Sequence, residues 1–322
     1  MTSTALWHIS PSESSLQEES LSTPLSHQLL IKSLYSLVST GTEKLVATGQ
    51  VPSSMHQLMR VPSMGGAFSF PVKYGYSLVG KVVSEGIFMG QLVHLLHPHQ
   101  AALVTDSADV SLVPPNIPAK RAALASNMET ALNAIWDSGV SIGDKVVVCG
   151  FGMIGGLVAR LLSLMPAVEV VVLEKNAYRI QQATNMGFLV NPTDLSNFDY
   201  SFHTSGSSKG LQACIEAVGM EGKIIELSWY GTKSVQLQLG ADFHYHRKQI
   251  ISSQVGHVPF TKNARWDYVR RKAVVWKLLK NPVFDAHITD EVPFGESPAF
   301  FAALRQGDLL TEGLGWVFRY EG

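Results

Sequence analysis

Two patterns of hydrophobic and polar residues divide the chain. In roughly the first hundred residues, short apolar runs at 29–38, 76–83, 91–96 and 101–104 are separated by Gly, Pro and Ser. Such runs predict a mostly antiparallel, irregular β domain. The Ser- and Glu-rich segment 10–22 is predicted to be a solvated loop or hairpin.

From residue 120 onwards, longer helical periods alternate with buried strands. The predicted helices are 122–137, 154–165, 177–185 and 209–218, and the predicted strands are 146–149, 168–173, 199–203, 222–227 and 250–254. This alternation predicts an α/β domain with a doubly wound parallel sheet. Helices at 264–279 and 297–305 follow, and a final strand at 315–320 is expected to return to the N-terminal β domain.

The first strand of the alternating region runs into Gly150-x-Gly152-x-x-Gly155. In a dinucleotide-binding turn the first glycine permits the tight turn, the second lets the backbone approach a pyrophosphate, and the third lets helix and strand pack closely. Glu174 ends the next strand, 19 residues after Gly155, where an acid would hydrogen-bond the adenosine ribose. A glycine-rich turn without a ligand is the alternative, but the flanking strands and helix favour a dinucleotide site.

Further cofactor contacts are predicted from the same topology. Met153 and Ile154 begin the helix whose N-terminal N–H groups would face the phosphates. Turns after parallel strands deliver residues to the cofactor, which selects Thr204, Ser205, Gly206, Ser228, Trp229, Val255 and Gly256. Glu174 favours NAD, whereas Lys175 and Arg179 could pair with a 2′-phosphate, so NADP stays open.

Composition excludes several classes of function. Hydrophobic residues make up 46% and charged residues 16% of the 322 residues, and the net charge is −1. The chain is therefore not disordered, and it has no basic field for nucleic acid or an anionic membrane. Its two cysteines, Cys149 and Cys214, lie in apolar stretches and are predicted to be buried. No secretion signal or membrane span is recognisable, so a cytoplasmic protein with a small-molecule substrate is expected.

Several segments resemble the medium-chain dehydrogenase/reductase (alcohol dehydrogenase-like) superfamily. These are Ile142-Gly-Asp144 before the glycine-rich strand and Ser252-Ser-Gln-Val-Gly256 after the sheet. Ser39-Thr-Gly-Thr-Glu43, Phe70-Pro-Val-Lys-Tyr-Gly-Tyr76 and His97-Pro-His-Gln100 resemble the branch that contains bacteriochlorophyllide a dehydrogenase. The resemblance implies a groES-like β domain (1–117 and 261–322) with an inserted Rossmann domain (118–260). It also implies a homodimer formed through edge strands, and the alternation of apolar residues at 234–239 is compatible with such an edge. Finally, it implies that Thr130 lies near the nicotinamide.

The chain departs from zinc-dependent relatives at all three expected ligand positions. Ser39 stands where they carry Cys, Tyr76 and Ser77 follow Gly75 in place of His-Glu, and Ser126 stands near a further ligand. Two cysteines also cannot form a four-cysteine structural site. Because hydroxyl groups are poor zinc ligands, we expect no zinc.

A histidine cluster offers no alternative metal site. In an extended strand His97 and His99 would share a face while His94 lies on the other, which leaves no third ligand in register.

Without zinc, a side chain must supply the proton for hydride transfer. The candidates are Tyr76, Ser39, Thr40, Glu43 and His99. Tyr76, in a segment with the cationic Lys73, could be the acid, or it could simply pack against the sheet. Glu43 could orient a substrate hydroxyl, or it could pair with Lys44 or Lys81 at the surface, which we favour.

The leading hypothesis is a zinc-independent NAD(P)-dependent oxidoreductase. It would transfer hydride between the nicotinamide and a small organic carbonyl, alcohol, quinone or activated alkene. The alternative is a catalytically weak dinucleotide-binding sensor or partner-binding protein, because every expected zinc position has changed.

Overall fold

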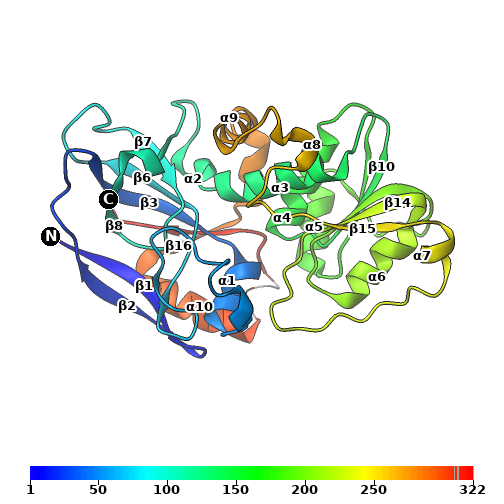
Figure 1. Cartoon of the computed structure of the whole chain (residues 1–322), viewed down its shortest axis with the longest axis horizontal. Helices are drawn as coiled ribbons and strands as arrows, with labels where there is room; N and C mark the ends of the chain where they lie inside the picture. Colours follow the sequence, from blue (N-terminus) through cyan, green and yellow to red (C-terminus); the bar gives the residue numbers. More distant parts are fainter. Residues whose placement is uncertain (308, 310–311, 322) are drawn as a thin grey trace. The chain divides into compact units, whose positions relative to one another are not determined.

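The computed structural model describes residues 1–307, 309 and 312–321 (Figure 1). The chain forms two compact units, Met1–Ser126 with Trp276–Gly322, and Asn127–Val275. The predicted boundaries at 117 and 260 lie earlier in the chain than the observed ones. The second unit keeps residues 261–275 because Arg271 donates to the side-chain oxygen of Asn133 (2.9 Å) and to the carbonyl oxygen of Val255 (2.7 Å).

The second unit contains the predicted doubly wound sheet, which confirms the fold class. Six parallel strands lie in the order β12-β11-β10-β13-β14-β15. Their bounds are β10 Lys145–Cys149, β11 Glu169–Leu173, β12 Leu189–Val190, β13 Phe198–His203, β14 Val218–Glu226 and β15 Gln249–Ser252. The strand order reverses between β10 and β13, which is where ligands bind in folds of this kind.

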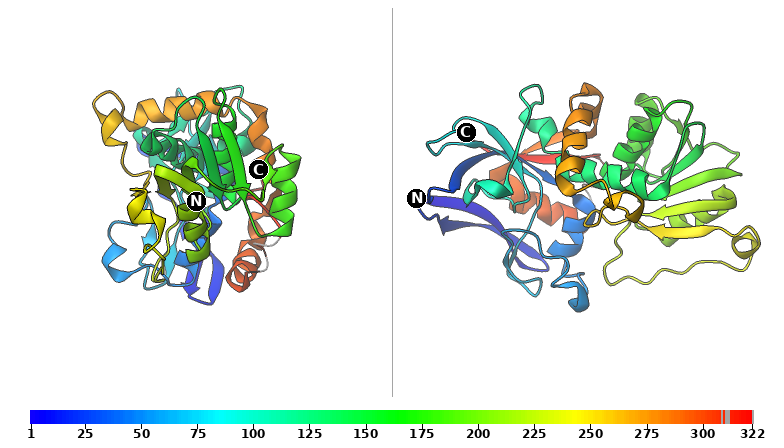
Figure 2. Two further views of the ribbon diagram at one scale, coloured as in Figure 1. Left: turned by 90° about the vertical axis from the view of Figure 1, so that its right-hand side faces the viewer. Right: turned by 45° about the horizontal axis from the view of Figure 1, so that its top comes forward.

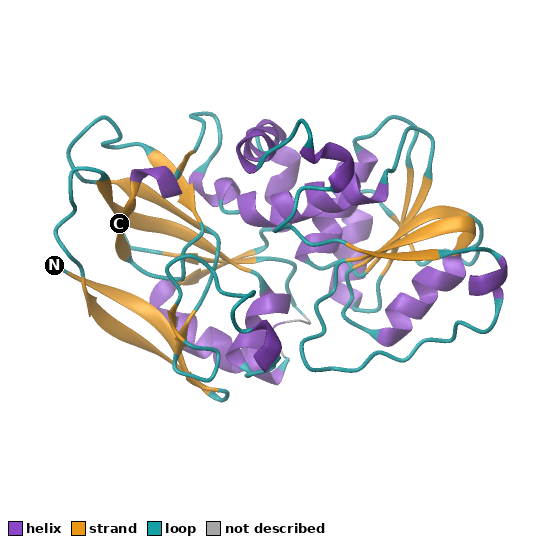
Figure 3. Cartoon of the chain, in the orientation of Figure 1, coloured by secondary structure: helices purple, strands orange, loops and turns teal. Residues whose placement is uncertain are grey.

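Helices cover both faces of this sheet (Figure 3). Those that pack on its strands include α4 Met153–Ser163, α5 Ala177–Asn185 and α6 Ser208–Ala217. The other helices here are α7 Asp242–Tyr245 and α8 Phe260–Asn263, with α3 Ala125–Ser138 and α9 Tyr268–Leu278, which both cross the boundary between the units. Val146, Val147 and Val148 of β10 are fully buried, as expected for a strand that is covered on both faces. Cys149 and Cys214 are both buried and free, as predicted.

The first unit is mostly antiparallel. A seven-stranded sheet contains β3 Gln28–Val38, β6 Leu78–Val82, β7 Leu92–Leu95, β8 Ala102–Asp106, β9 Ser111–Leu112, β16 Asp290–Pro293 and β17 Trp316–Arg319. A smaller sheet contains β1 Thr2–Ser10, β2 Glu13–Ser20, β4 Gly65–Gly66 and β5 Val72–Lys73. β17 pairs with β3, so the last strand returns to the N-terminal β structure as predicted. The Ser- and Glu-rich segment forms the β1–β2 hairpin (Figure 2).

Short helices complete the first unit. They are α1 Thr40–Ala47, α2 Ala119–Ala122 and α10 Ser297–Gln306, with 3₁₀ turns at Ser53–Met55, Ser107–Asp109, Pro282–His287 and Phe294–Glu296. Phe301 of α10 packs with Phe318 of β17 and Leu6 of β1 in one buried cluster. No helix among the described residues is long and apolar enough to cross a membrane.

Two sequence predictions were wrong in detail. The helix predicted at 264–279 begins at Tyr268, after the separate turn of α8. Residues 234–239 form no strand, so their alternation is no sheet edge. Val235 and Leu237 instead pack against the cluster around α6, and Gln238 donates its backbone N–H to the side chain of Gln212 (2.8 Å).

Candidate functional site

The glycine-rich turn has the close packing that its sequence predicts. Gly150 has a φ of +100°, and a Cβ built on it would lie 2.9 Å from the Cα of Ser205. A Cβ on Gly155 would overlap the carbonyl oxygen of Gly150. Gly152 is different, because its Cβ would meet only Nη1 of Arg179, at 3.6 Å. The first and third glycines are therefore required by the protein itself, whereas the second leaves space above the start of α4.

Glu174 and Arg179 flank this space. One carboxylate oxygen of Glu174 accepts the backbone N–H of Phe151 (2.7 Å), and the other accepts those of Lys175 (2.7 Å) and Asn176 (2.9 Å). Glu174 thus ties the end of β11 to the glycine turn. Burial lowers the pKa of Arg179, and the charge of Glu174 opposes this shift. Lys175 is exposed beside them.

The loops after β13 and β14 meet at the same edge. Thr204 donates its hydroxyl to the carbonyl oxygen of Gly150 (2.7 Å). The Ser205 hydroxyl lies 2.7 Å from Nε2 of His203, and the Gly206 N–H donates to the Ser228 hydroxyl (3.0 Å). These predicted residues therefore lie together, but the three hydroxyls bond to the protein itself.

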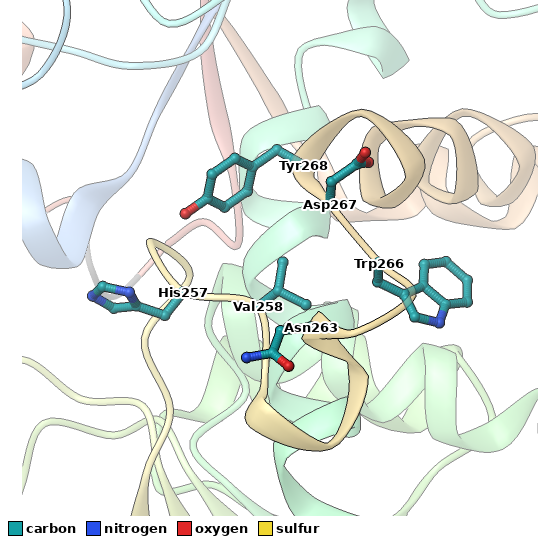
Figure 4. A pocket seen from close by; sticks show the side chains of 6 residues that line it. All are labelled: His257, Val258, Asn263, Trp266, Asp267 and Tyr268. Carbon is teal, nitrogen blue, oxygen red and sulfur yellow. The ribbon is translucent and has the colours of Figure 1, made fainter.

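The remaining predicted cofactor residues are more dispersed. Met153 and Ile154 begin α4, Trp229 is half-buried after β14, and Thr130 is half-buried on α3. Gly256 accepts the Tyr268 hydroxyl on its carbonyl oxygen (2.7 Å), and the Val255 carbonyl is bound by Arg271. Tyr268 also lines a shallow hollow of about 270 Å³ (Figure 4) with His257, Val258, Asn263, Trp266 and Asp267.

In the first unit, Glu43 and His99 form a buried pair. Glu43 is 1% exposed and His99 is 0% exposed, and Nε2 of His99 donates to Glu43 (2.8 Å). The Ser36 hydroxyl lies 2.7 Å from Nδ1 of His99 and 2.8 Å from the Tyr320 hydroxyl. The preferred interpretation of Glu43 as a surface partner of Lys44 or Lys81 is therefore wrong, because burial requires a partner inside the domain.

Tyr76 lies next to this network. Burial and the nearby charge of Glu43 raise its pKa to about 12, against opposing hydrogen bonds with Ser39 and Thr42. Ser39 precedes α1, where its backbone N–H donates to Glu43 (2.7 Å), and Thr40 is the first residue of the helix. The structure thus brings together four of the five predicted catalytic residues, Tyr76, Ser39, Glu43 and His99, with Thr40 adjacent in the chain.

The Lys73 side chain bonds to the β1–β2 hairpin and not to Tyr76. Its ammonium donates to Glu19 (2.6 Å) and to the side-chain oxygen of Gln100 (3.0 Å). The interpretation of Lys73 as a charge that assists Tyr76 is therefore wrong.

The side chains at the expected zinc positions do not fit zinc. Ser126 donates its hydroxyl to the Tyr76 carbonyl oxygen (2.8 Å), and Ser77 donates to the carbonyl oxygen of Ala123 (2.6 Å). No three His, Cys, Asp or Glu side chains come together with metal-binding spacing in the part of the chain that the structure describes. His94 lies beside Ser77 (3.1 Å), and Nδ1 of His97 lies 2.9 Å from the Pro98 carbonyl oxygen, so the nearby histidines have separate partners.

Sequence reasoning missed a polar cluster at the edge of the parallel sheet. His203 ends β13, Glu226 ends β14, and Nδ1 of His203 lies 2.9 Å from both oxygens of Glu226. The Tyr230 hydroxyl donates to Glu226 (3.0 Å). Polar residues that end successive buried strands were the available signal, as Glu174 had already indicated for β11.

The chain is similar in sequence and in fold to known dehydrogenases. No family model matches the chain. It is 26% identical over 195 residues to D-guloside 3-dehydrogenase of Escherichia coli (strain K12), which is 56% of each chain. It is 26% identical over 253 residues to 2-desacetyl-2-hydroxyethyl bacteriochlorophyllide A dehydrogenase of Cereibacter sphaeroides, or 71% of this chain and 75% of that one.

A solved structure extends the comparison over nearly the whole chain. Acetophenone reductase from Geotrichum candidum, in complex with NAD, superimposes with a TM-score of 0.76 at 17% identity, over 99% of this chain and 97% of that one. The resemblance to the medium-chain dehydrogenase/reductase superfamily is confirmed. The chain shares the fold of that structure, and its match to D-guloside 3-dehydrogenase spans only about half the length of that relative.

Proposed function

We propose that the protein is a zinc-independent NAD(P)-dependent oxidoreductase that transfers hydride between a nicotinamide and a small organic carbonyl, alcohol, quinone or activated alkene. The observation that carries the proposal is the glycine turn, in which Gly150 and Gly155 are packed against the protein while Gly152 leaves space. Structures of the same fold hold NADP or NADH, which supports a nicotinamide cofactor. The named relatives are dehydrogenases, which supports the reaction class.

Residues around the turn would hold the dinucleotide. The N–H groups at the start of α4 would bind the pyrophosphate, and the guanidinium of Arg179 beside Gly152 would add positive charge. Glu174 can accept ribose hydroxyls in addition to its backbone partners, because each carboxylate oxygen has two lone pairs. A carboxylate at this place repels a 2′-phosphate, so NAD is the proposed cofactor.

Tyr76 is the proposed proton donor in the reductive direction. The cofactor, when bound, would supply the hydride for the carbonyl carbon, and the carbonyl electron pair would then need a proton at oxygen. Tyr76 would donate its phenolic proton to that oxygen. Hydrogen bonds with Ser39 and Thr42 would favour the resulting phenolate against the charge of Glu43, until solvent returned a proton. A pKa of about 12 keeps the phenol protonated at neutral pH, so its proton is available to an oxygen that develops alkoxide charge.

Zinc independence rests on the chemistry of the available side chains. Ser39, Tyr76 and Ser126 carry hydroxyls that already bond within the protein, and zinc prefers thiolate, imidazole or carboxylate ligands. A cytoplasmic homodimer completes the proposal, on the basis of composition and of the family resemblance.

A matched pair of tyrosine variants tests the proton donor. Tyr76→Phe removes the proposed acid, whereas Tyr74→Phe removes the hydroxyl of an edge-on neighbour, 6.0 Å away between ring centroids. In a screen of ketones, quinones and activated alkenes with NADH and NADPH, we expect Tyr76→Phe to lower kcat by about 10²-fold or more. Tyr74→Phe should keep kcat within about threefold. Equal kcat values for wild type and Tyr76→Phe would contradict this role, and cofactor binding without any turnover would favour the sensor alternative.

A further inference from the structure

We propose that His203 is a positioning residue for the dinucleotide, and this inference rests on the proposed function. His203 is the last residue of β13 and is fully buried. Its parallel neighbour in register is Glu226, the last residue of β14. The two side chains therefore meet at the carboxyl edge of the sheet, at the base of the loops 204–206 and 227–230.

The hydrogen bonds determine which nitrogen carries the proton. An ionised carboxylate only accepts, so Nδ1–H of His203 donates to Glu226, 2.9 Å away. Nε2 then accepts the hydroxyl of Ser205 at 2.7 Å. One imidazole thus links the loop after β13 to the carboxylate that begins the loop after β14.

Glu226 extends the link into the second loop. Its two oxygens accept the backbone N–H of Ser228 (2.6 Å) and the hydroxyl of Tyr230 (3.0 Å). The Ser228 hydroxyl in turn accepts the N–H of Gly206 (3.0 Å), which closes a ring of hydrogen bonds through both loops. Removing His203 would open this ring at its buried centre.

The ring also reaches the glycine turn. A Cβ on Gly150 would lie 2.9 Å from both the Cα and the backbone nitrogen of Ser205, so the two loops touch. The Thr204 hydroxyl bonds the Gly150 carbonyl directly. A shift of loop 204–206 would therefore displace the turn that is proposed to receive the pyrophosphate.

The position of the pair is the reason to connect it with a ligand. Strands of a parallel sheet are normally apolar throughout, and a buried imidazole and carboxylate stabilise a fold no better than a well-packed apolar pair. Here Phe202 and Ile225, which precede the pair, are fully buried and apolar. The only other buried polar side chain that β13 places before the pair is the hydroxyl of Ser201, which bonds the Cys214 carbonyl, so the ionisable pair itself lies at the edge where ligands bind in this fold.

Two isosteric variants separate the halves of the link. In His203→Asn the amide nitrogen replaces Nδ1–H and can still reach Glu226, whereas in His203→Gln the longer amide can reach Ser205. If both contacts position the loops, each variant should raise the Kd for NADH at least about tenfold, which corresponds to about 1.4 kcal/mol. Phe202→Leu, in the adjacent buried position, is the control. It should lower Tm while it changes the Kd less than about twofold.

A double-mutant cycle distinguishes positioning from direct contact. Ser205→Ala removes the exposed end of the link and should not prevent folding. If His203 acts through Ser205, the Kd of the double variant His203→Asn/Ser205→Ala for NADH should not exceed the higher Kd of the two single variants. Additive effects would overturn the proposal. The proposal would also be overturned if the His203 variants had a lowered Tm, like Phe202→Leu, but bound NADH as tightly as wild type. In that case the proposed function would stand. If wild type binds neither NADH nor NADPH, both proposals fail.

Discussion

Gly152 offers a test in which cofactor binding and folding respond differently. Its φ of −85° and ψ of −168° are accessible to any residue. A Cβ there would meet only Nη1 of Arg179, at an ordinary contact distance of 3.6 Å. Gly152→Ala should therefore fold normally, and the reduced freedom of the unfolded chain should stabilise it by about 0.4–1 kcal/mol. For a chain of this size, that raises Tm by no more than about 4 °C.

The same methyl group should be costly to the ligand. It would occupy the space through which the backbone approaches the pyrophosphate. Losing one charge-assisted hydrogen bond costs about 1.5–3 kcal/mol, so the Kd for NADH should rise about 10- to 150-fold.

The assay is a fluorescence titration with NADH, with a thermal melt of the same samples. Gly240→Ala is the matched control, since a Cβ on Gly240 meets no atom within 4 Å and Gly240 lies away from the turn. Its Kd should equal that of wild type, and its Tm should rise slightly, for the same reason as that of Gly152→Ala. If Gly152→Ala bound NADH as tightly as wild type while Gly240→Ala behaved as expected, the assignment of the turn to the pyrophosphate would be refuted.

Three further predictions concern the first unit. Glu43→Gln should lower the free energy of unfolding by about 1–3 kcal/mol in urea titrations, because it removes the charge from buried hydrogen bonds with His99 and the Ser39 N–H; no measurable loss would contradict that pairing. Burial lowers the pKa of His97 to about 4, so the folded state disfavours its proton. Its contribution to the free energy of unfolding is therefore complete above the unfolded pKa of about 6.5 and is lost as the pH falls toward 4. In urea titrations, His97→Gln should lose less stability than wild type between pH 7 and 5. Equal losses would contradict the lowered pKa of His97. Elemental analysis of the purified protein should find well under one zinc per chain, and a stoichiometric content would overturn the zinc-independent mechanism.

The sequence predicted the structure best where the interacting residues are close together in the chain. The path from β10 through the glycine turn into α4 follows from a few neighbouring residues, because Gly150 takes a φ of +100° and Gly155 packs against the carbonyl oxygen of Gly150, five residues earlier. The segment 234–239 shows the limit of such patterns. Alternating apolar residues predict an edge strand, yet Val235 and Leu237 use the same alternation to cover α6.

The pairing of charged side chains was not predictable from one sequence. Glu43 and His99 are 56 positions apart, and only the sheet and α1 together bring them within 2.8 Å. His203 and Glu226 are 23 positions apart but occupy equivalent ends of adjacent parallel strands. Aligning the predicted strand ends would have revealed that second pair, whereas no local rule would have revealed the first.

The most direct test of the account is a side-by-side fluorescence titration of the wild-type protein with NADH and NADPH. The account predicts saturable binding of both or of NADH alone, with NADH bound more tightly because Glu174 repels a 2′-phosphate. Tighter binding of NADPH would contradict the role given to Glu174 and would assign the cofactor preference to Arg179 or Lys175. Failure to bind either nucleotide would contradict the central claim that the glycine turn holds a nicotinamide dinucleotide.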